Sequence, residues 1–161
     1  MLIRDANAND FAQILRLNEE SVHFLSPLSL SRLQSLHAEA DYHRVLEIDD
    51  EVVGFLLAFR EGTPYDSINY RWFVNQYEQF LYIDRVVVSA QHQGRGIGNK
   101  LYDDIFTHAL SSDAKRITCE FDIEPPNEAS RHFHQRYGFA EVGTQATSDG
   151  KKQVSLQAVS L

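Results

Sequence analysis

Apolar and polar positions alternate between two periods along the chain, and this pattern predicts a mixed α/β fold. Apolar residues recur every three or four positions in four segments, which predict helices over residues 8–25, about 30–36, 97–110 and 127–137. Alternating or continuous apolar residues predict strands over 1–5, 42–48, 52–61, 80–89 and 116–121, and a closing hairpin over 138–146 and 152–159. The run over 80–89 is apolar almost throughout, which is typical of a strand covered on both faces.

Polar residues at the element ends support these boundaries. Asn7 or Asn9 is expected to cap the first helix, and Ser29 or Ser31 the second. The acidic stretch 49–51 predicts a hairpin turn between two strands. The segment 62–79 departs from both periods although it is rich in aromatic residues. It could form a lid, a binding wall or a subunit contact, or its aromatic side chains could fold back onto the core.

Length and composition limit the possible classes of protein. A chain of 161 residues with 43% apolar residues fits one soluble domain over 1–161. The net charge of −8 argues against a nucleic-acid partner and is compatible with a cationic substrate. No apolar stretch is long enough to span a membrane, and the first residues do not resemble a signal peptide. With the single cysteine Cys119, the expected location is the reducing cytoplasm.

Three glycines at alternate positions, Gly94, Gly96 and Gly98, stand between a predicted buried strand and a helix. N–H groups at a helix start bind anions, and glycine permits unusual backbone angles there. Arg95 and Lys100 add local positive charge, so a phosphate or pyrophosphate is the expected ligand. The ATP-binding pattern fails because no Ser or Thr follows Lys100. The dinucleotide pattern G-x-G-x-x-G fails by one residue and is kept as a rival.

Two motifs in order resemble the GCN5-related N-acetyltransferase (GNAT) superfamily. Residues 93–98, QGRGIG, are similar to its [QR]-x-x-G-x-[GA] loop for acetyl-CoA. Residues 127–139, NEASRHFHQRYGF, are similar to its N-x-x-A/S-x-x-x-Y-x-x-x-G-F segment. The order of elements is also similar, so the likeness covers essentially the whole chain.

The resemblance implies a fold and a cofactor site. The fold is a mixed, mostly antiparallel, twisted sheet of about six or seven strands with a splayed central pair, flanked by about four helices. A bulged strand would offer backbone groups to the pantetheine arm, with an N–H near Val87 facing the developing oxyanion. The implied acetyl-CoA contacts are Val86, Val87, Val88, Gln93, Gly94, Arg95, Gly96, Ile97, Gly98, Asn99 and Asn127. Asn127 is equally explained as a helix cap.

The resemblance also implies catalytic roles. A general base is needed because a lysine-like amine has a reference pKa of about 10.4. Glu120 is the first candidate, Asp84 the second and Asp122 the third, with a structural ion pair as the alternative for Asp84. The family's usual tyrosine, which often protonates the departing thiolate, is replaced here by His134. A histidine can donate that proton near neutral pH, or only bond the sulfur.

Covalent and metal chemistry are not expected. Cys119 lies in a predicted strand beside apolar residues, and direct attack needs no thiol nucleophile. His132 and His134 point in nearly opposite directions on a helix, so they do not share a metal ion.

The sequence thus predicts an N-acetyltransferase that moves an acetyl group from acetyl-CoA to a small-molecule or peptide amine by direct attack. The alternatives are a non-catalytic acyl-CoA sensor, a dinucleotide-dependent oxidoreductase and an enzyme for a longer acyl group. No nucleic-acid, membrane or metal partner is expected, and family analogy leaves a homodimer open. The acceptor is not determined by the sequence.

Overall fold

A computed structural model describes residues 1–22 and 25–161 of the chain. Seven strands form a sheet in the order β1-β2-β3-β4-β5-β7-β6. The strands are β1 (Leu2–Asp5), β2 (Tyr42–Ile48), β3 (Glu51–Arg60), β4 (Leu81–Val88), β5 (Arg116–Glu124), β6 (Ala140–Ala146) and β7 (Gln153–Ser160). The α-helices are α1 (Phe11–Glu20), α2 (Leu30–Glu39), α3 (Ile68–Val74), α4 (Ile97–Leu110) and α5 (Glu128–Arg136).

Most strand pairs are antiparallel, as predicted. β1 with β2, β2 with β3, β5 with β7 and β6 with β7 all pair in this way. β4 and β5 pair in parallel at their first residues, Leu81 with Ile117 and Tyr82 with Thr118. The expected fold class is therefore confirmed, while the splay of the central pair stays a prediction.

The chain divides into two compact units. The first unit comprises Met1–Phe59 and Ile83–His108, and the second comprises Arg60–Tyr82 and Ala109–Leu161. The single domain over 1–161 remains an expectation. No helix among residues 1–22 and 25–161 is long and apolar enough to cross a membrane.

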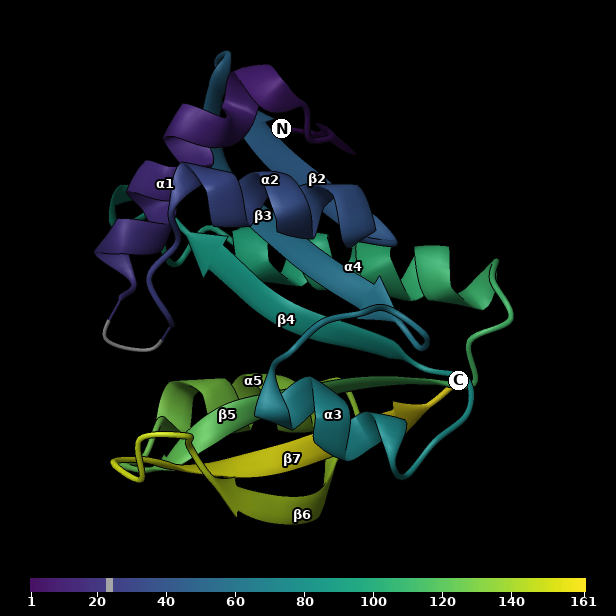
Figure 1. Cartoon of the computed structure of the whole chain (residues 1–161). Coiled ribbons are helices and arrows are strands. Elements are labelled where there is room, and N and C mark those ends of the chain that lie inside the picture. Colours follow the sequence, from purple (N-terminus) through teal and green to yellow (C-terminus); the bar gives the residue numbers. More distant parts are fainter. Residues whose placement is uncertain (23–24) are drawn as a thin grey trace. The chain divides into compact units, whose positions relative to one another are not determined.

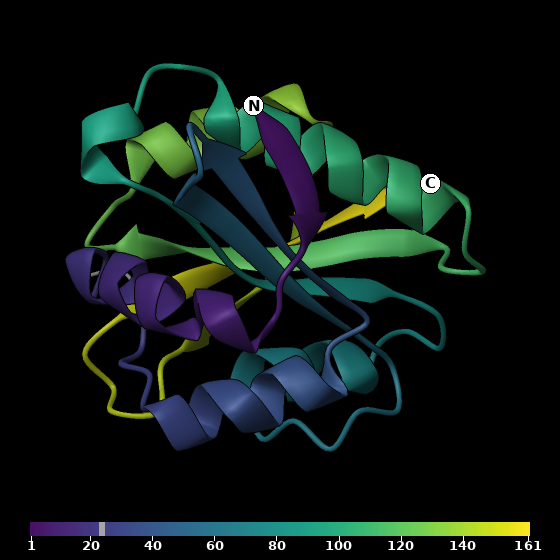
Figure 2. The ribbon, with the colours of Figure 1, turned by 90° about the horizontal axis from the view of Figure 1, so that it is seen from above.

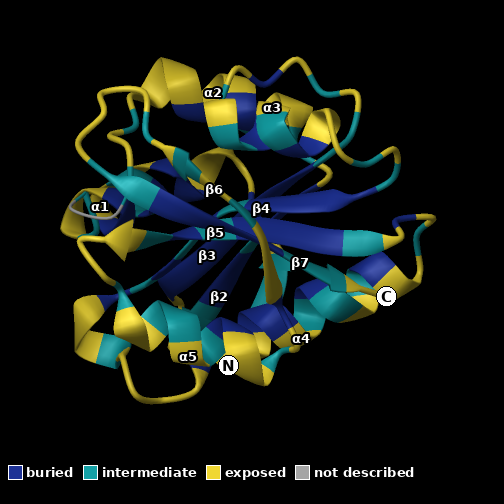
Figure 3. Cartoon of the chain, turned by 90° about the horizontal axis from the view of Figure 1, so that it is seen from below, coloured by how far each residue is buried: buried dark blue, intermediate teal, exposed yellow. Residues whose placement is uncertain are grey.

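In the first unit, β2 and β3 carry helices on both faces (Figure 2). Residues 52–59 of β3 are all buried, and Figure 3 shows the central strands as buried ribbons. Phe55 packs in a cluster with Ile14 of α1 and Leu33 of α2. Its neighbour Gly54 faces the other way because side chains alternate along a strand.

Gly54 of β3 faces β4 and the start of α4. A Cβ atom there would stand 3.0 Å from the carbonyl oxygen of Val87 and 3.2 Å from Cγ2 of Ile97. Since the first of these is a backbone atom, only glycine fits without a shift of β4. This glycine therefore sets how closely β4 and the start of α4 pack against β3.

A pair of histidines joins α2 to β2 in the same unit. The Nδ1 atoms of His37 and His43 lie 2.8 Å apart. Burial, and the positive charge that His37 can carry, lower the pKa of His43 to about 4. His43 is thus held neutral in the folded protein, whereas an unfolded histidine titrates near 6.5.

We therefore expect the first unit to lose stability as the pH falls from about 6.5 to about 4. In this window His43 binds a proton in the unfolded chain but not in the folded chain. The free energy of unfolding should therefore fall by about 3 kcal/mol across the window. Above pH 6.5 His43 should contribute no pH dependence. Urea unfolding at several pH values would measure the slope. His43→Gln should flatten it and His132→Gln, an exposed control, should not; equal slopes in all three proteins would contradict the assignment.

In the second unit, β5, β7 and β6 carry α3 and α5 (Figure 1). Trp72 of α3 lies against β6, where a Cβ atom at Gly143 would stand only 2.6 Å from Cζ2 of the indole. The ring of His134, on α5, lies 5.6 Å from that of Phe121 on β5. Glu120 and Phe121 are adjacent in β5, so their side chains point to opposite faces.

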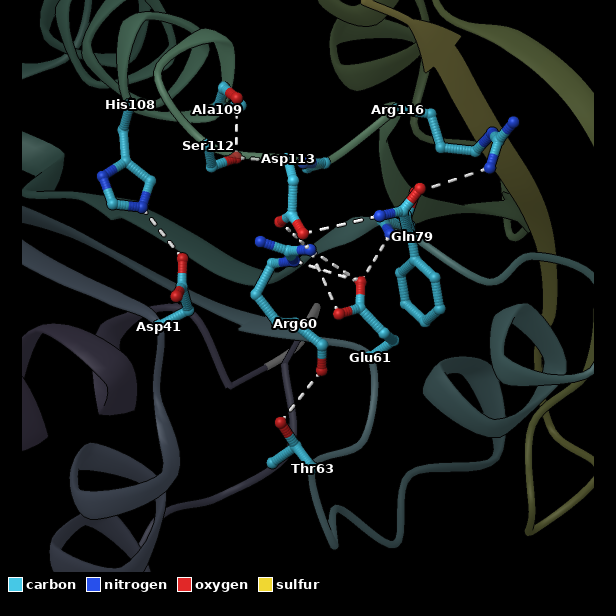
Figure 4. A network of polar contacts seen from close by, with 12 residues as sticks. Asp41, Arg60, Glu61, Thr63, Gln79, His108, Ala109, Ser112, Asp113 and Arg116 are labelled. Carbon is cyan, nitrogen blue, oxygen red and sulfur yellow. Dashed lines mark hydrogen bonds and ion pairs between the residues drawn. The ribbon is translucent and has the colours of Figure 1, made fainter.

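Polar contacts hold the residues at the two ends of the segment 62–79 (Figure 4). The carboxylate of Glu61 accepts a hydrogen bond of 2.9 Å from the backbone N–H of Phe80. The guanidinium of Arg60 pairs with Glu61 at 3.0 Å and with Asp113 at 2.7 Å. The backbone N–H of Lys115 donates to the carbonyl of Gln79 at 3.2 Å. Both ends of the segment are therefore held by contacts with other residues of the second unit.

The largest difference from the predicted elements lies inside this segment. Residues 68–74 form α3, a fifth α-helix that the periodicity did not indicate. Ser67 caps it, and Tyr70 and Phe73 are buried, so these aromatic side chains do fold onto the core. Seven residues are too few for a clear apolar stripe, and Ile68 and Val74 stay exposed.

Most other boundaries agree closely. The helix predicted over 8–25 is a 3-10 turn at Ala8–Asp10 followed by α1, which ends at Glu20; residues 23 and 24 lie outside the described residues. Asn7 caps the 3-10 turn in a capping box with Asp10, and Ser29 caps α2. Asp49 and Asp50 have positive φ angles of 51° and 63°, as a tight hairpin turn requires.

Candidate active site

The carboxylate of Glu120 is the best-supported candidate base in the second unit. The hydroxyl of Tyr82, a buried residue of β4, lies 2.8 Å from Oε1 and 2.9 Å from Oε2. The side-chain amide of Asn69 on α3 donates to Oε1 at 3.1 Å. These donors hold the carboxylate in one orientation, which a general base requires.

Tyr82, Asn69 and Gln145 are functional candidates that the sequence did not reveal. The amide of Gln145 on β6 donates to Oδ1 of Asn69 at 2.9 Å, so β6 contacts Glu120 indirectly, through Asn69. The only available signal was Glu120 itself, because a carboxylate among apolar residues needs donors. The sequence does not identify where such donors come from.

Asp84, the second candidate base, forms a buried ion pair in the first unit. Its carboxylate lies 2.7 Å from Nε of Arg85, and the two side chains are 5% and 4% exposed. Arg85 also donates to Oδ1 of Asn18 at 3.0 Å and to Oγ of Ser26 at 3.2 Å. The cation is thus Arg85 itself, and this pair gives Asp84 a structural reason to be buried.

Asp122, the third candidate, lies two residues beyond Glu120 on β5. The ammonium of Lys152 lies 3.3 Å from its carboxylate. Asp84 and Asp122 therefore each have a cationic partner.

The imidazole of His134 is buried on α5. Its Nδ1 atom lies 2.7 Å from the carbonyl oxygen of Ser130, one helical turn earlier. A carbonyl only accepts, so Nδ1 carries a proton and a neutral ring has Nε2 as an acceptor. Burial lowers the pKa of His134 below its ordinary value, with the Ser130 carbonyl opposing that shift. To act as an acid, the ring must therefore be in its doubly protonated form.

Cys119 is a buried residue of β5. Burial raises the pKa of its thiol well above the ordinary value, and the charge of Glu120 raises it further. A thiol that resists ionisation is a poor nucleophile, which agrees with the reading of Cys119 as structural.

Histidine and acidic side chains come together at one place on α5. His132 lies 3.8 Å from the carboxylate of Glu128, one turn earlier on α5. Over residues 1–22 and 25–161, no group of three His, Cys, Asp or Glu side chains is placed to hold an ion.

The candidate cofactor loop belongs to the first unit. Gly94 and Gly96 have φ angles of +80° and +75°, values that side-chain-bearing residues rarely adopt. A Cβ atom at either position would meet nothing within 4 Å. The glycines are therefore needed for backbone shape, and no protein atom presses on them.

Residues around these glycines suit an anion. Gln93, Arg95, Asn99 and Lys100 are exposed, and Gly98 is half-buried. Ile97 is buried and anchors the start of α4 against β3. The first turn of a helix directs N–H groups outward without intrahelical acceptors, and the helix dipole favours negative charge there. The loop thus fits a pyrophosphate.

The remaining predicted cofactor residues are divided between the units. Val87 is buried in the core of the first unit, while Val86 and Val88 are half-buried on β4. Asn127, in the second unit, caps α5 by accepting a hydrogen bond of 3.2 Å from the N–H of Ser130. The capping role predicted for Asn127 is thus observed, and its contact with acetyl-CoA stays a prediction.

Known proteins resemble this chain in sequence and in fold. Residues 8–139 match the family model described as "Acetyltransferase (GNAT) family". A phosphinothricin N-acetyltransferase of Streptomyces coelicolor is 42% identical over 59 residues, which are 37% of this chain and 33% of that enzyme. The match thus spans about a third of that enzyme's length.

Two solved structures show the same fold over nearly the whole chain. Ard1 from Thermoplasma volcanium superposes with a TM-score of 0.82 at 16% identity, covering 99% of this chain and 97% of that one. The putative acetyltransferase yncA from Salmonella typhimurium, solved with its cofactor acetyl-CoA, gives a TM-score of 0.77 at 18% identity, with coverages of 100% and 94%.

Proposed function

Because the chain belongs to the GNAT acetyltransferase family, we propose that it moves an acetyl group from acetyl-CoA to a primary amine by direct attack. The observation that carries this proposal is the open glycine loop at the start of α4, with Gly94 and Gly96 in backbone conformations that suit a pyrophosphate. Acetyl-CoA would supply the activated acetyl thioester. Gln93 to Asn99 would hold its pyrophosphate, and Val86 to Val88 its pantetheine arm.

Each remaining role falls to a residue with suitable chemistry. Glu120 would take the proton of the amine, so that the nitrogen lone pair is free to attack the thioester carbon. A backbone N–H near Val87 would stabilise the oxyanion that forms. His134 would return a proton to the departing thiolate.

The acceptor is proposed as a class. The partial match to a phosphinothricin N-acetyltransferase favours small amines. The net charge of −8 favours cationic amines. Amino acids, polyamines and peptide N-termini therefore all belong in the test.

The deciding experiment measures release of free CoA thiol from acetyl-CoA in the presence of an amine panel. An acetyltransferase gives amine-dependent thiol release and an acetylated product. An acyl-CoA sensor binds acetyl-CoA without either. Competition by NAD for the CoA site would favour the oxidoreductase, and a faster reaction with longer acyl-CoA donors would revise the acyl group.

The acid role of His134 predicts a particular pH dependence. Since its pKa is lowered, turnover should fall as the pH rises through a value below 6.5, where the doubly protonated ring disappears. We expect His134→Phe to lower kcat about a hundredfold. His134→Tyr, which restores the family's usual residue, should keep turnover and lose the fall. A wild-type pH profile without this fall would leave His134 as a contact of the CoA sulfur only.

A further inference from the structure

Two side-chain amides form a relay that ends on the candidate base. Gln145 on β6 donates from Nε2 to Oδ1 of Asn69 at 2.9 Å. Asn69 on α3 then donates from Nδ2 to Oε1 of Glu120 at 3.1 Å. Neither amide is distant from solvent, since both residues are half-buried.

The relay has a single direction. An ionised carboxylate only accepts hydrogen bonds, so Asn69 must turn its NH₂ group toward Glu120. Its carbonyl oxygen then faces Gln145 and needs a donor, which the NH₂ group of Gln145 supplies. The orientation of both amides is therefore matched to the charged form of Glu120, the form that accepts a proton.

Packing does not require Asn69 to be an amide. The helix α3 is held by the buried rings of Tyr70 and Phe73, by the Ser67 cap and by the contact of Trp72 with Gly143. These contacts do not involve the side-chain amide of Asn69. The polar groups of Asn69 instead meet Glu120 and Gln145.

We propose that Asn69, oriented by Gln145, is a positioning residue that keeps Glu120 ionised and correctly aimed for proton abstraction. This inference rests on the proposed function, in which Glu120 is the base. It gives the aromatic segment 62–79 a role in catalysis through a residue that is not aromatic.

Several other ionisable groups lie near Glu120 and are distinguished by their own contacts. The hydroxyl of Tyr82 on β4 lies within hydrogen-bond distance of both carboxylate oxygens, at 2.8 and 2.9 Å. Asp122 shares the face of β5 with Glu120 and is paired with Lys152 at 3.3 Å. Cys119 is adjacent in β5 and buried. From α3 and β6, the neutral amides of Asn69 and Gln145 contribute to this network.

The test is the pH profile of kcat/KM for variants at position 69. Asn69→Leu removes a donor from the charged carboxylate, so the acidic limb of the profile, the pH range in which kcat/KM falls as Glu120 is protonated, should shift to higher pH by about one unit. Activity should be near normal at pH values where Glu120 is ionised again. Asn69→Asp keeps the shape but adds a negative charge, so its limb should move further. Asn75→Leu, an exposed position just after α3, is the control and should keep the wild-type limb.

A structural role would give a different result. Loosening of α3 would lower kcat equally at all pH values, in Asn69→Asp as in Asn69→Leu, and would overturn the inference. Gln145→Glu tests the relay from the edge strand, where folding is least at risk. A carboxylate there would turn the NH₂ group of Asn69 away from Glu120, so the acidic limb should again move up. An unmoved limb would also overturn the inference.

The two levels of the proposal fail in different ways. Inactive Glu120→Gln together with unshifted profiles in the Asn69 and Gln145 variants would remove the relay and keep the base. Full turnover in Glu120→Gln would remove the base assignment itself.

Discussion

Replacing Glu120 with glutamine is expected to lower kcat about a hundredfold to ten-thousandfold, while acetyl-CoA still binds. Glutamine has nearly the same shape, and its carbonyl oxygen can still accept a hydrogen bond from Tyr82. It cannot take up a proton at neutral pH, so the amine would have to lose its proton to water. Steady-state thiol release and calorimetric titration with CoA would measure the two quantities.

The same strand offers a matched control. Glu124→Gln changes the same functional group at an exposed position of β5 and should leave turnover close to wild type. Thermal unfolding of both variants would exclude a general loss of structure. If Glu120→Gln kept most of its activity, Asp84→Asn and Asp122→Asn would identify which of the other two carboxylates serves as the base.

The second large effect is expected in the loop before α4. Gly94→Val and Gly96→Val place a β-branched residue at φ angles of +80° and +75°, where such residues are strained. The strain of about 1–2 kcal/mol should be relieved by a change of loop shape that removes the cradle for the pyrophosphate. We expect the Kd for acetyl-CoA to rise at least about tenfold, as measured by calorimetric titration.

Two glycines outside the loop serve as control positions, which distinguish the effect of backbone strain from the loss of ligand binding. Gly62 and Gly150 have φ angles of +81° and +71°, and a Cβ atom at either would meet nothing within 4 Å. Gly62→Val and Gly150→Val should therefore cost similar stability and leave the Kd for acetyl-CoA unchanged. Equal affinity across all four variants would show that the loop before α4 does not hold the cofactor.

The fold was predictable where local pattern and tertiary packing agree. The run over 80–89 indicated a covered strand, and β4 is that strand. Ser29 and Asn7 were among the predicted caps, because a side-chain acceptor at a helix start acts within a few residues. The helix α3 was not predictable, since the rings of Tyr70 and Phe73 pack against Tyr82 of β4, a contact outside the helix that its own periodicity does not reveal.

The candidate site was predictable only for residues whose own type carries the chemistry. Glu120 was identified because the resemblance to the GNAT superfamily implies a carboxylate near this point of the strand. Its donors Tyr82 and Asn69 were missed. A tyrosine beside apolar residues is typical of the core, and the segment 62–79 has no period that would place Asn69 on a particular face. The pair of Asp84 with Arg85 was also not fixed by sequence, because adjacent strand residues normally face opposite ways.

The contact between Trp72 and position 143 gives a means of tuning the enzyme from a distance. Any side chain at position 143 would push the indole of Trp72. Because Trp72 is on the same helix as Asn69, α3 and the amide of Asn69 would move with it. Directed-evolution libraries that aim at a new working pH should therefore include this edge-strand position, although it touches no proposed substrate. Natural sequences that lack glycine at this place should carry a smaller residue in place of Trp72.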